Sequence, residues 1–553
     1  MRINNKKILT IKLKGLTWQV LPENVDRLKK EIIPAVFETG ELFDLSPIKK
    51  TDTRLVTRCH PQNSEHPLIV KVFKRSDIGS KIKSFFRPSR SGKEWKIGHK
   101  LSKRSLSTPP LVASGTSRKF GLLQKDYIIS REIIGAKPLN VWIEENIHRK
   151  SISYLEKKEI IHAFALFVRL VHDKGIYPSD FHQGNVLIKI EKDRPPEFYL
   201  IDLHSIRIKR KLRLNHRIKN LVQLNDFQIS TTDRLRFLKS YLSGKGIKGI
   251  PVKTFAKRIG KKSLKDWNRL WAKRKRKNLK PNKFAKIFEI NSWVGMIQND
   301  TDFFQTFQKI NFSAQESGVK NIKNTPSVAV KELALTQSNE SRCFIIKKYL
   351  QIGWVDKIKA VVRTSRAKRC WINAHNLLMR GISTPRPIAF AEKKRLGRVR
   401  ESFFMSEKLP GAQASDLFLA DPSKRSFLKQ EFLFNLARQV RWMHQTNICH
   451  GDLKASNILV VLHEQRPGIF FVDLDGVKVC NSIRIKDIAK DLSRMKAAFS
   501  DILAQSQMEY FFRVYGRDNT FFQSHKKKIM EKVDNLTMKK IEQKRAEVRR
   551  LNK

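Results

Sequence analysis

The sequence predicts an α+β fold in two tandem copies, each with a small β-rich N-lobe and a larger helical C-lobe. Residues 178–185 read Pro-Ser-Asp-Phe-His-Gln-Gly-Asn and residues 450–457 read His-Gly-Asp-Leu-Lys-Ala-Ser-Asn, so both contain an Asp followed five positions later by an Asn. In each copy an apolar strand follows and ends in a second Asp, at Asp202 or Asp473. A composite segment that recurs in this way indicates a duplicated domain.

The spacing between equivalent residues supports the duplication. Lys71 and Lys347 are separated by 276 positions, whereas Asp180 and Asp452 are separated by 272. Long blocks of nearly constant offset, changing by a few residues between blocks, are what insertions and deletions in the loops of a copied domain produce.

Each half begins with strands. In the first half, Arg-Leu-Val-Thr-Arg at 54–58 and Leu-Ile-Val-Lys-Val-Phe at 68–73 flank a turn-rich segment and predict a β-hairpin. Segments 327–330 and 343–349 repeat this plan in the second half. A helical stretch follows in both halves, and a Ser-Thr-Pro sequence ends it before another strand.

A longer helix is predicted just before each Asp-x4-Asn segment. Its apolar side chains recur at i, i+4 and i+7, which is the stripe by which an amphipathic helix packs on a core. The stripe consists of Phe164, Val168 and Val171 in the first half and of Leu436, Val440 and Met443 in the second half.

We predict a first domain at 1–250, a basic helical connector at 251–300 and a second domain at 301–553. The connector carries Trp267 and Trp271 at helical spacing. They could contact nucleic acid, but tryptophans at this spacing more often pack against a neighbouring domain, and packing is the favoured interpretation.

The charge of the chain predicts anionic partners. Its 553 residues include 112 Lys and Arg against 51 Asp and Glu, a formal net charge of +61. Such a field attracts anionic membrane surfaces, phosphorylated glycolipid and nucleic acid, although compositional drift towards lysine is an equally weighted cause of the excess. Five scattered cysteines favour a reducing compartment without structural zinc. Because no apolar run approaches ~20 residues, we expect a cytoplasmic protein, peripheral to a membrane at most.

The first half contains the groups that phosphoryl transfer from a magnesium nucleotide requires. Lys71 lies on a predicted strand, where its ammonium could hold the nucleotide phosphates, and Glu94 in the following helix could fix it by an ion pair. Asp180 is the proposed base for the acceptor hydroxyl, and Asn185 and Asp202 are the proposed Mg²⁺ ligands. A lone Asp-x4-Asn would be read as a hydrogen-bonded turn, but the strand lysine, the second Asp and the repeat favour a kinase.

The second half keeps this set except for one member. Its equivalents are Lys347, Asp452, Asn457 and Asp473. The position that matches Glu94 is Cys370, so Lys347 either uses another partner or has lost efficient nucleotide binding. Lys454 is a further candidate contact to the nucleotide. Asp475 could be an additional metal ligand, although a surface turn residue is the favoured interpretation.

Neither half has a convincing Gly-x-Gly-x-x-Gly above the phosphates. The expected places, at 39–57 and 315–333, contain almost no glycine apart from Gly40 and Gly318. This argues against a typical protein kinase and predicts a looser cover over the nucleotide.

The second half in particular resembles the bacterial lipopolysaccharide kinases of the Kdo/WaaP family. The similarity is carried by the strand lysine, by Gly-Ile-Ser-Thr-Pro-Arg-Pro at 381–387, by Leu-Pro-Gly-Ala at 409–412 and by the sequence at 450–457, and it extends over 54–242 and 330–516. The resemblance implies a protein-kinase-like fold and ATP- and Mg²⁺-dependent phosphorylation of a sugar hydroxyl, on Kdo or heptose. It also implies a lipopolysaccharide or lipid A-core acceptor at the inner face of the inner membrane.

Two other hypotheses remain at this point. One is a protein or small-molecule kinase with the same core, against which the lack of a recognisable Ala-Pro-Glu after either metal Asp argues. The other is a partly degenerate pseudokinase scaffold that binds a membrane or RNA, although a scaffold has no physical need for Asp180, Asn185 and Asp202 together. Nucleic acid is the less favoured partner.

Overall fold

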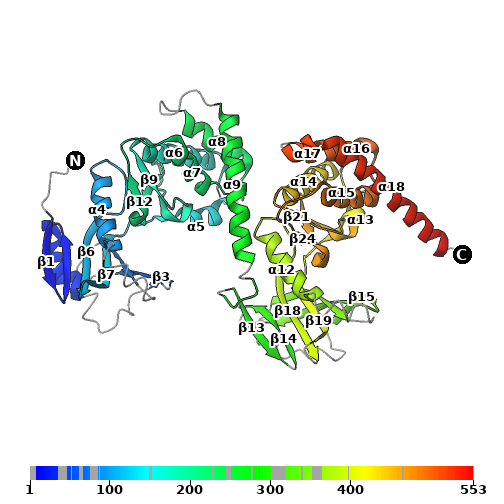
Figure 1. The fold of residues 1–553 in the computed structure, drawn as a ribbon, viewed down its shortest axis with the longest axis horizontal. Helices are drawn as coiled ribbons and strands as arrows, with labels where there is room; N and C mark the ends of the chain where they lie inside the picture. The colour runs from blue at the N-terminus through cyan, green and yellow to red at the C-terminus, as the bar shows by residue number, and fades with distance from the viewer. Residues whose placement is uncertain are drawn as a thin grey trace. The chain divides into compact units, whose positions relative to one another are not determined.

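The chain divides into two compact units, Met1–Ser263 (unit 1) and Leu264–Lys553 (unit 2) (Figure 1). The computed structural model describes residues 8–34, 47–51, 53–60, 66–74, 85, 88–148, 152–226, 229–243, 251–275, 278–282, 284–290, 292–299, 319–337, 340–350, 364–395, 398–463, 466–517 and 519–551. Each unit combines one seven-stranded sheet with a group of helices, which confirms a mixed fold with two sheet-containing regions.

The sheet of unit 1 is antiparallel throughout. In spatial order its strands are β1 (Leu9–Leu13), β2 (Leu16–Val20), β6 (Leu111–Lys119), β7 (Leu122–Arg131), β5 (Leu68–Phe73), β4 (Arg54–Cys59) and β3 (Pro47–Thr51). The pairing of β4 with β5 confirms the hairpin predicted at 54–58 and 68–73. The β1–β2 hairpin, which the sequence analysis did not foresee, turns at Lys14 and Gly15, both with positive φ as a two-residue hairpin turn requires.

Helices and short strands complete unit 1. They are α1 (Val25–Arg27), α4 (Arg90–Ser102), β8 (Lys137–Pro138), α5 (Leu139–Ile143), α6 (Tyr154–Asp173), β9 (Ile176–Pro178), β10 (Val186–Lys189), β11 (Glu197–Leu200), β12 (Ile206–Ile208), α7 (Leu214–Leu224) and α8 (Thr231–Leu242). The predicted stripe lies on α6, where Val168 and Val171 are fully buried. A capping box of Ser153 and Glu156 begins this helix, which leads directly to the Asp-x4-Asn segment.

The sheet of unit 2 repeats the strand order of unit 1. Its strands are β13 (Ala285–Ile290), β14 (Trp293–Gln298), β18 (Pro387–Arg395), β19 (Arg398–Glu407), β17 (Glu340–Leu350), β16 (Val328–Gln337) and β15 (Val319–Thr325). Because every strand has a counterpart at the same place in unit 1, the structure confirms the internal duplication.

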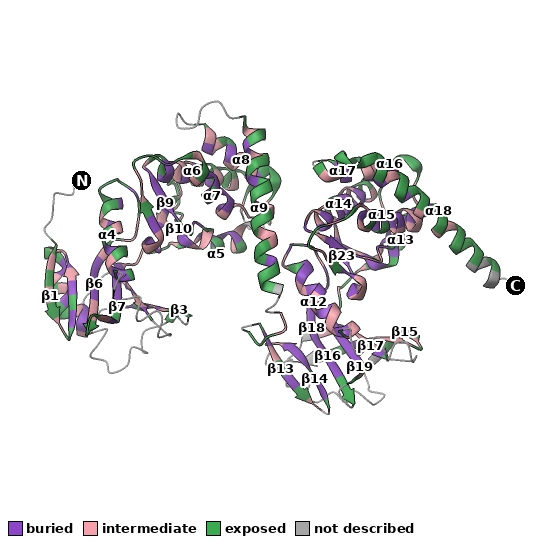
Figure 2. Cartoon of the chain, in the orientation of Figure 1, coloured by how far each residue is buried: buried purple, intermediate pink, exposed green. Residues whose placement is uncertain are grey.

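The remaining elements of unit 2 also follow the plan of unit 1. They are α12 (Arg366–Leu378), β20 (Gln413–Ala414), α13 (Ser415–Ala420), α14 (Ser426–Gln445), β21 (Ile448–Cys449), β22 (Ile458–His463), β23 (Arg466–Phe471), β24 (Lys478–Val479), α15 (Ile485–Phe499), α16 (Gln505–Gly516), α17 (Thr520–Ser524) and α18 (Lys526–Leu551). One continuous core joins α12, α14, α15, α16 and the start of α18, whereas the far end of α18 is largely exposed (Figure 2).

The segment 251–300, predicted as a basic helical connector, contains more than a helix. Helix α9 (Val252–Lys275) occupies its first part, and Phe255 of this helix belongs to the core of unit 1. Trp271 is buried and has the guanidinium of Arg380 over its ring at 4.8 Å, which confirms packing for this tryptophan. Within the same segment, residues 285–290 and 293–298 form β13 and β14, which are part of the sheet of unit 2.

Candidate active sites

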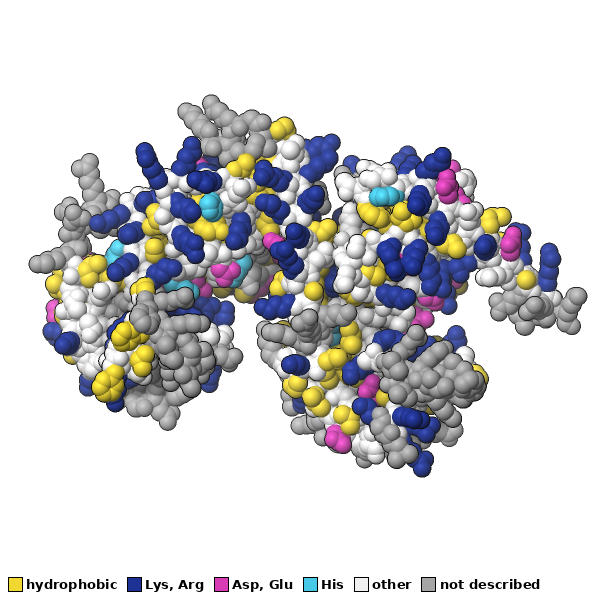
Figure 3. Space-filling view, viewed as in Figure 1, with side chains coloured by type: hydrophobic (Ala, Val, Ile, Leu, Met, Phe, Trp, Pro, Cys, Tyr) yellow, Lys and Arg dark blue, Asp and Glu magenta, His cyan; other side chains and the backbone are white. Residues whose placement is uncertain are grey.

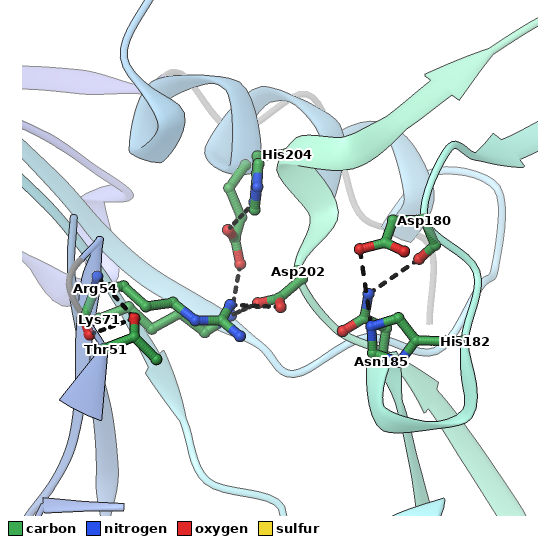
Figure 4. Close-up of polar contacts among 9 residues, drawn as sticks. Thr51, Arg54, Lys71, Asp180, His182, Asn185, Asp202 and His204 are labelled. Atoms are coloured by element: carbon green, nitrogen blue, oxygen red, sulfur yellow. Dashed lines mark hydrogen bonds and ion pairs between the residues drawn. The ribbon is translucent and has the colours of Figure 1, made fainter. Parts of the chain in front are cut away.

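In unit 1, Lys71 on β5 lies between two carboxylates. Its Nζ is 2.9 Å from Glu94 Oε1 and 3.1 Å from Asp202 Oδ1 (Figure 4). The ion pair predicted between Lys71 and Glu94 is therefore present in the structure. All three side chains are at least 88% removed from solvent, since their exposed fractions are 12%, 4% and 10%.

Helix α4 is held where Glu94 can reach the strand lysine. Its N-cap residue Ser89 accepts a hydrogen bond from the backbone N–H of Gly92. The carboxylate of Asp126, on β7, accepts from the backbone N–H groups of Arg90 and Ser91 at 3.0 and 3.1 Å. These bonds satisfy donors that the first turn of a helix leaves unpaired, and they fasten α4 to the sheet.

The charges of this site stabilise one another. Burial alone would lower the pKa of Lys71, but the charges of Glu94 and Asp202 outweigh it and raise that pKa. Burial likewise opposes ionisation of Glu94 and Asp202, yet the positive charge of Lys71 keeps the pKa of both carboxyl groups below the usual value. All three groups are thus charged near neutral pH, as a lysine that binds phosphate requires.

Arg54 is a functional candidate that the sequence analysis missed. Its guanidinium donates to Asp202 Oδ2, and the turn before it is closed by a 3.1 Å hydrogen bond from the Arg54 backbone N–H to Thr51 Oγ1 (Figure 4). This turn joins β3 to β4, at the place where a glycine-rich loop was sought. Since Val56 pairs with Lys71 and Val330 with Lys347, strand register matches Arg54 to Val328. The position of unit 2 that matches Arg54 therefore carries no cation.

Asp180 in unit 1 is an accessible carboxylate. Its side chain is 67% exposed, and His182 Nε2 lies 3.7 Å from Asp180 Oδ2. Asn185 Nδ2 donates to the Asp180 backbone carbonyl at 2.9 Å, which leaves the amide oxygen of Asn185 as its potential ligand atom. Asp202 follows β11 in a left-handed conformation, with φ of 58°. The structure thus places Asn185 beside Asp180, and Asp202 beside Lys71 (Figure 4).

The loop of unit 2 that carries Asp452 is held by a buried aspartate on α15. Asp491 is fully buried and accepts from the backbone N–H groups of His450 and Gly451 at 2.7 and 2.8 Å. Asn457 Nδ2 donates to Asp452 Oδ2 at 3.1 Å. The residue of unit 1 that matches Asp491 is Asn220, whose Nδ2 instead donates to the Pro178 carbonyl at 2.7 Å. A neutral amide and a proline carbonyl therefore replace the charged anchor of unit 2.

Two cations lie beside Asp452. Lys454 Nζ is 3.5 Å from Asp452 Oδ2, and Arg494 NH1 is 3.3 Å from Asp452 Oδ1. Lys454 was predicted as a nucleotide contact, and the structure places it next to the proposed catalytic carboxylate. Arg494 was not foreseen, because it comes from α15, about 40 residues beyond the motif that it contacts.

Lys347, the strand lysine of unit 2, pairs with Asp473, but helix α12 has no carboxylate at the position that matches Glu94. Lys347 Nζ is 3.1 Å from Asp473 Oδ1. Cys370, at the position of Glu94, lies with its Sγ 3.4 Å from the hydroxyl of Tyr349. Burial raises the pKa of the Cys370 thiol to about 12, so the thiol is neutral and cannot balance the charge of Lys347.

Asp475 lies in a turn, as the favoured interpretation held, but its side chain is largely removed from solvent and ion-paired. Its side chain is 19% exposed, and Asp475 Oδ2 accepts from Arg366 Nε at 2.7 Å. The guanidinium of Arg366 also lies over the ring of Tyr349, 4.6 Å from its centroid. The residue matching Asp475 in unit 1 is His204, whose Nδ1 lies 3.5 Å from Glu94 Oε2. In unit 1 the carboxylate of this pair of positions is Glu94, on helix α4. In unit 2 it is Asp475, which follows Asp473 by two residues.

Both units present oxygen ligands suited to a hard cation. Asn185 with Asp202, and Asn457 with Asp473, offer one amide oxygen and one carboxylate each, the ligand types that Mg²⁺ prefers. In unit 1, Arg54 and Lys71 both bind Asp202, which shows that this carboxylate lies in a place that attracts positive charge. The donor atoms are therefore of the types that the metal expected from the sequence prefers.

Comparison with known proteins assigns the family. Residues 47–241 and 347–515 both match the lipopolysaccharide kinase (Kdo/WaaP) family, and together they make up more than half of the chain. The chain belongs to this family. Each matched segment lies within one copy of the fold, 47–241 within unit 1 and 347–515 within unit 2.

Curated relatives in the lipopolysaccharide kinase family are 3-deoxy-D-manno-octulosonic acid kinases. The one from Photobacterium profundum is 32% identical over 22% of this chain and 48% of its own length. The one from Haemophilus influenzae is 30% identical over 22% of this chain and 53% of its own length. That of Photobacterium damsela is 27% identical over 36% of this chain and 76% of its own length. The chain thus spans about half the length of the first two relatives.

Among solved structures, one of WaaP in complex with acyl carrier protein is similar to this chain. It has 18% sequence identity and a TM-score of 0.30, and the match covers 40% of this chain and 89% of that chain.

Proposed function

We propose that the protein is an ATP-dependent kinase with two active sites, which phosphorylates sugar hydroxyls of the lipopolysaccharide inner core, on Kdo or heptose. The observation that carries the proposal is the assembly, in both units of a family member, of a strand lysine, an accessible Asp with its Asn, and a second Asp. We also propose that each unit is a two-lobed, protein-kinase-like domain, with its sheet as the small lobe.

In unit 1 each proposed role follows from the position of the side chain. Asp180 is exposed, so it can receive the proton of an acceptor hydroxyl that approaches from solvent. The hydroxyl oxygen forms a bond to the γ-phosphorus of ATP, the bond to the bridging oxygen breaks, and ADP leaves. Lys71 and Arg54 would stabilise the phosphate charge, and Glu94 holds Lys71 in place.

The metal would be bound by Asn185 and Asp202 in unit 1 and by Asn457 and Asp473 in unit 2. A bound Mg²⁺ would neutralise negative charge on the nucleotide phosphates. In unit 2, Asp452 would be the base, with Asn457 orienting its carboxylate.

The charge of the chain supports an acceptor held in a membrane. Lys and Arg side chains are spread over much of the face shown in Figure 3, and acidic side chains are few on it. None of the described helices is long and apolar enough to cross a bilayer. We propose that the protein acts peripherally at the inner face of the inner membrane, where attraction to anionic lipids brings it to lipid-linked sugars.

Mass spectrometry of the lipopolysaccharide core tests this function. A strain without the protein should have a core that lacks one phosphate for each active unit, and the unaltered chain should restore it. Complementation with Asp180→Asn or with Asp452→Asn would show which phosphate belongs to which unit. A core with an unchanged phosphate content would contradict the proposal.

A further inference from the structure

Unit 2 contains a second group of potential metal ligands, different in chemistry from the oxygen ligands proposed for Mg²⁺. The thiols of Cys449 and Cys480 and the carboxylate of Asp487 have their ligand atoms within 4.8 Å of one another. Cys449 is buried, and the other two residues are partly exposed. We call these three residues the thiol cluster. Two sulfur atoms and a carboxylate suit Zn²⁺, whereas Mg²⁺ prefers oxygen ligands.

Strand pairing brings the two cysteines together, although they are far apart in the sequence. Cys449 ends β21 and pairs with Lys478 of β24, and Cys480 directly follows β24. The backbone N–H of Cys480 donates to the Asn447 carbonyl at 2.8 Å. The scattered spacing of the cysteines predicted no structural zinc, but the pairing of β21 with β24 creates a closeness that this spacing does not show.

Asn447 orders the segment between Cys480 and helix α15. It has a left-handed conformation, with φ of 61°. Its Nδ2 donates to the Asn481 carbonyl at 3.3 Å, and its Oδ1 accepts from the Ile483 backbone N–H at 3.3 Å. Asp487 lies in the first turn of α15, just after this segment. Both ligands that follow β24 are thus carried by hydrogen-bonded backbone, which lowers the cost of ordering them around an ion.

Arg484 holds the carboxylate of Asp487 from the more exposed side. Its Nε is 2.7 Å from Asp487 Oδ2 and its NH2 is 3.3 Å from Oδ1, and its side chain is 62% exposed against 16% for Asp487. Each carboxylate oxygen has a further lone pair that can bind a metal. A divalent ion with two thiolates and one carboxylate carries a net charge of −1, which the Arg484 guanidinium would balance.

The charges around Cys449 favour a cation. Burial raises the pKa of the Cys449 thiol, and the negative charges of Asp491 and Asp487 raise it further. The negative potential that opposes a thiolate attracts a positive ion, although the net charge of the chain is +61. When the ion binds, each thiol would release its proton to solvent and bind as a thiolate.

Unit 1 has different groups at all three positions. By strand register and position on the helix, the residues that match Cys449, Cys480 and Asp487 are Tyr177, Lys209 and His216. Lys209 Nζ is 3.3 Å from His216 Nε2, and the ring centroids of Tyr177 and His216 are 4.9 Å apart. The ammonium group of Lys209 would repel a metal ion. The thiol cluster is therefore a feature of unit 2 and not of the fold.

We propose that Cys449, Cys480 and Asp487 bind a Zn²⁺ ion that fastens the loop carrying Asp452. Zn–S bonds are about 2.3 Å long, so two thiolates on one tetrahedral ion are about 3.8 Å apart. The two thiols would have to approach each other by about 1 Å at most. Three protein ligands leave the fourth position to water.

The ion would add a link between α15 and the strand that leads into this loop. Cys449 directly precedes His450, whose backbone N–H donates to Asp491 of α15 at 2.7 Å. Asp487 lies one turn before Asp491, so the two carboxylates share a face of the helix. One would hold the loop through its backbone and the other through the metal. This role does not depend on the proposed kinase activity.

Metal binding to the full-length chain tests the thiol cluster. The chain, without a histidine tag, is kept reduced and in excess Mg²⁺, which occupies the oxygen ligands, and is titrated with Zn²⁺ against a chromophoric chelator. We expect one tightly bound Zn²⁺ per chain. Co²⁺ in its place should give thiolate-to-cobalt charge-transfer absorption in the near ultraviolet, because sulfur ligates the ion.

Cys480→Ser should weaken Zn²⁺ binding by about a hundredfold or more and reduce the charge-transfer band, because a hydroxyl is a much poorer ligand than a thiolate. Asp487→Asn should weaken binding by about tenfold or more and keep the band. Zn²⁺ should raise the unfolding temperature of the unaltered chain but not that of Cys480→Ser. Since Cys480 is partly exposed, this variant should keep its fold. The matched control is Cys343→Ser, a partly exposed cysteine on β17 of the same unit, which should change neither affinity nor band.

Three results would overturn the site. The first is equal Zn²⁺ affinity in Cys480→Ser and Cys343→Ser. The second is a Co²⁺ complex of the unaltered chain without the charge-transfer band, which would place the ion on oxygen ligands. The third is a disulfide between Cys449 and Cys480 in the reduced chain, detected by mass spectrometry, because it would remove both thiolates. None of these measurements needs phosphate transfer, so failure of the proposed kinase function would leave their outcome unchanged.

Discussion

At the scale of single residues, the two sites balance the positive charge of their equivalent strand lysines with different partners. Lys71 is held by Glu94 from the helix and by Asp202, whereas Lys347 has Asp473 and a neutral thiol at Cys370. A charged pair between strand and helix keeps a phosphate-binding lysine in one position before the nucleotide arrives. Preorganisation of this kind lowers the cost of reaching the transition state.

Removal of the Glu94 carboxylate should therefore affect kcat/KM for ATP at unit 1 only. In a chain with Asp452→Asn, Glu94→Gln should lower kcat/KM for ATP by about tenfold or more, because Lys71 loses its buried partner. In a chain with Asp180→Asn, the matched change Cys370→Ala should have a much smaller effect, since the thiol carries no charge. Steady-state kinetics of phosphate transfer measures both. Equal losses in the two units would show that Glu94 does not position Lys71.

His172 should make the stability of unit 1 depend on pH. Burial, and then the charge of Arg217, lowers the pKa of His172 to about 3. The unfolded chain binds a proton at this residue near pH 6.5, whereas the folded chain does not, so the free energy of unfolding decreases as pH falls below that value. One proton corresponds to at most about 1.4 kcal/mol per pH unit. Denaturant titrations between pH 7 and pH 5 should show a smaller slope for His172→Gln. The exposed control His162→Gln should keep the slope; an identical slope in all three proteins would contradict the assignment.

At the scale of elements, the parts with strong local patterns could be predicted from the sequence. The β4–β5 hairpin, the β16–β17 hairpin, α6 and α14 were all anticipated. The β13–β14 hairpin was not, because it directly follows a highly basic segment and was assigned with that segment to a connector. Its strands are stabilised by pairing β14 with β18, a partner almost 100 residues away in the sequence.

The site could be predicted in part for a similar reason. The motif residues were found because their spacing is short and repeated. Arg54, Arg494 and the role of Asp475 depend on strand register and helix packing, which no short sequence window contains. For Arg54 one signal was available: a basic residue at the start of the strand that pairs with the strand of Lys71.

The cap on α4 links this element to nucleotide binding. Asp126→Ala would leave the backbone N–H groups of Arg90 and Ser91 without their acceptor, so it should lower the free energy of unfolding by about 1–3 kcal/mol. It should also raise the KM for ATP at unit 1, because Glu94 lies one turn further along α4. Denaturant titration and kinetics in the Asp452→Asn chain measure the two effects. The exposed control Glu159→Ala on α6 should change neither; a KM for ATP that stays constant in Asp126→Ala would separate the cap from the site.

At the scale of the whole molecule, the large positive charge should control where the protein acts. Each basic residue near an anionic bilayer contributes about 1 kcal/mol, and the attraction decays over a Debye length of about 8 Å at physiological salt. Sedimentation with anionic vesicles should therefore be strong at low salt and largely lost near molar salt. Neutral vesicles are the control and should bind little. Strong binding to neutral vesicles, or binding that salt does not weaken, would contradict an electrostatic attachment.

Duplication gives the molecule two sites that have diverged in complementary ways. Unit 1 keeps the helix carboxylate and adds Arg54, whereas unit 2 keeps a charged anchor for its catalytic loop and adds cations around Asp452. Divergence of this kind is expected when two copies retain one reaction and act on different acceptors.

Phosphate transfer by the double variant Asp180→Asn/Asp452→Asn tests the central claim most directly. With lipid A-core glycolipid and radiolabelled ATP, the unaltered chain should label the glycolipid, each single variant should lose the label from one acceptor position, and the double variant should transfer none. The substitutions keep the size of the side chain and remove only the proton acceptor, so folding and nucleotide binding should persist. If the double variant transfers phosphate at the rate of the unaltered chain, the two aspartates are not the catalytic bases and the account is contradicted.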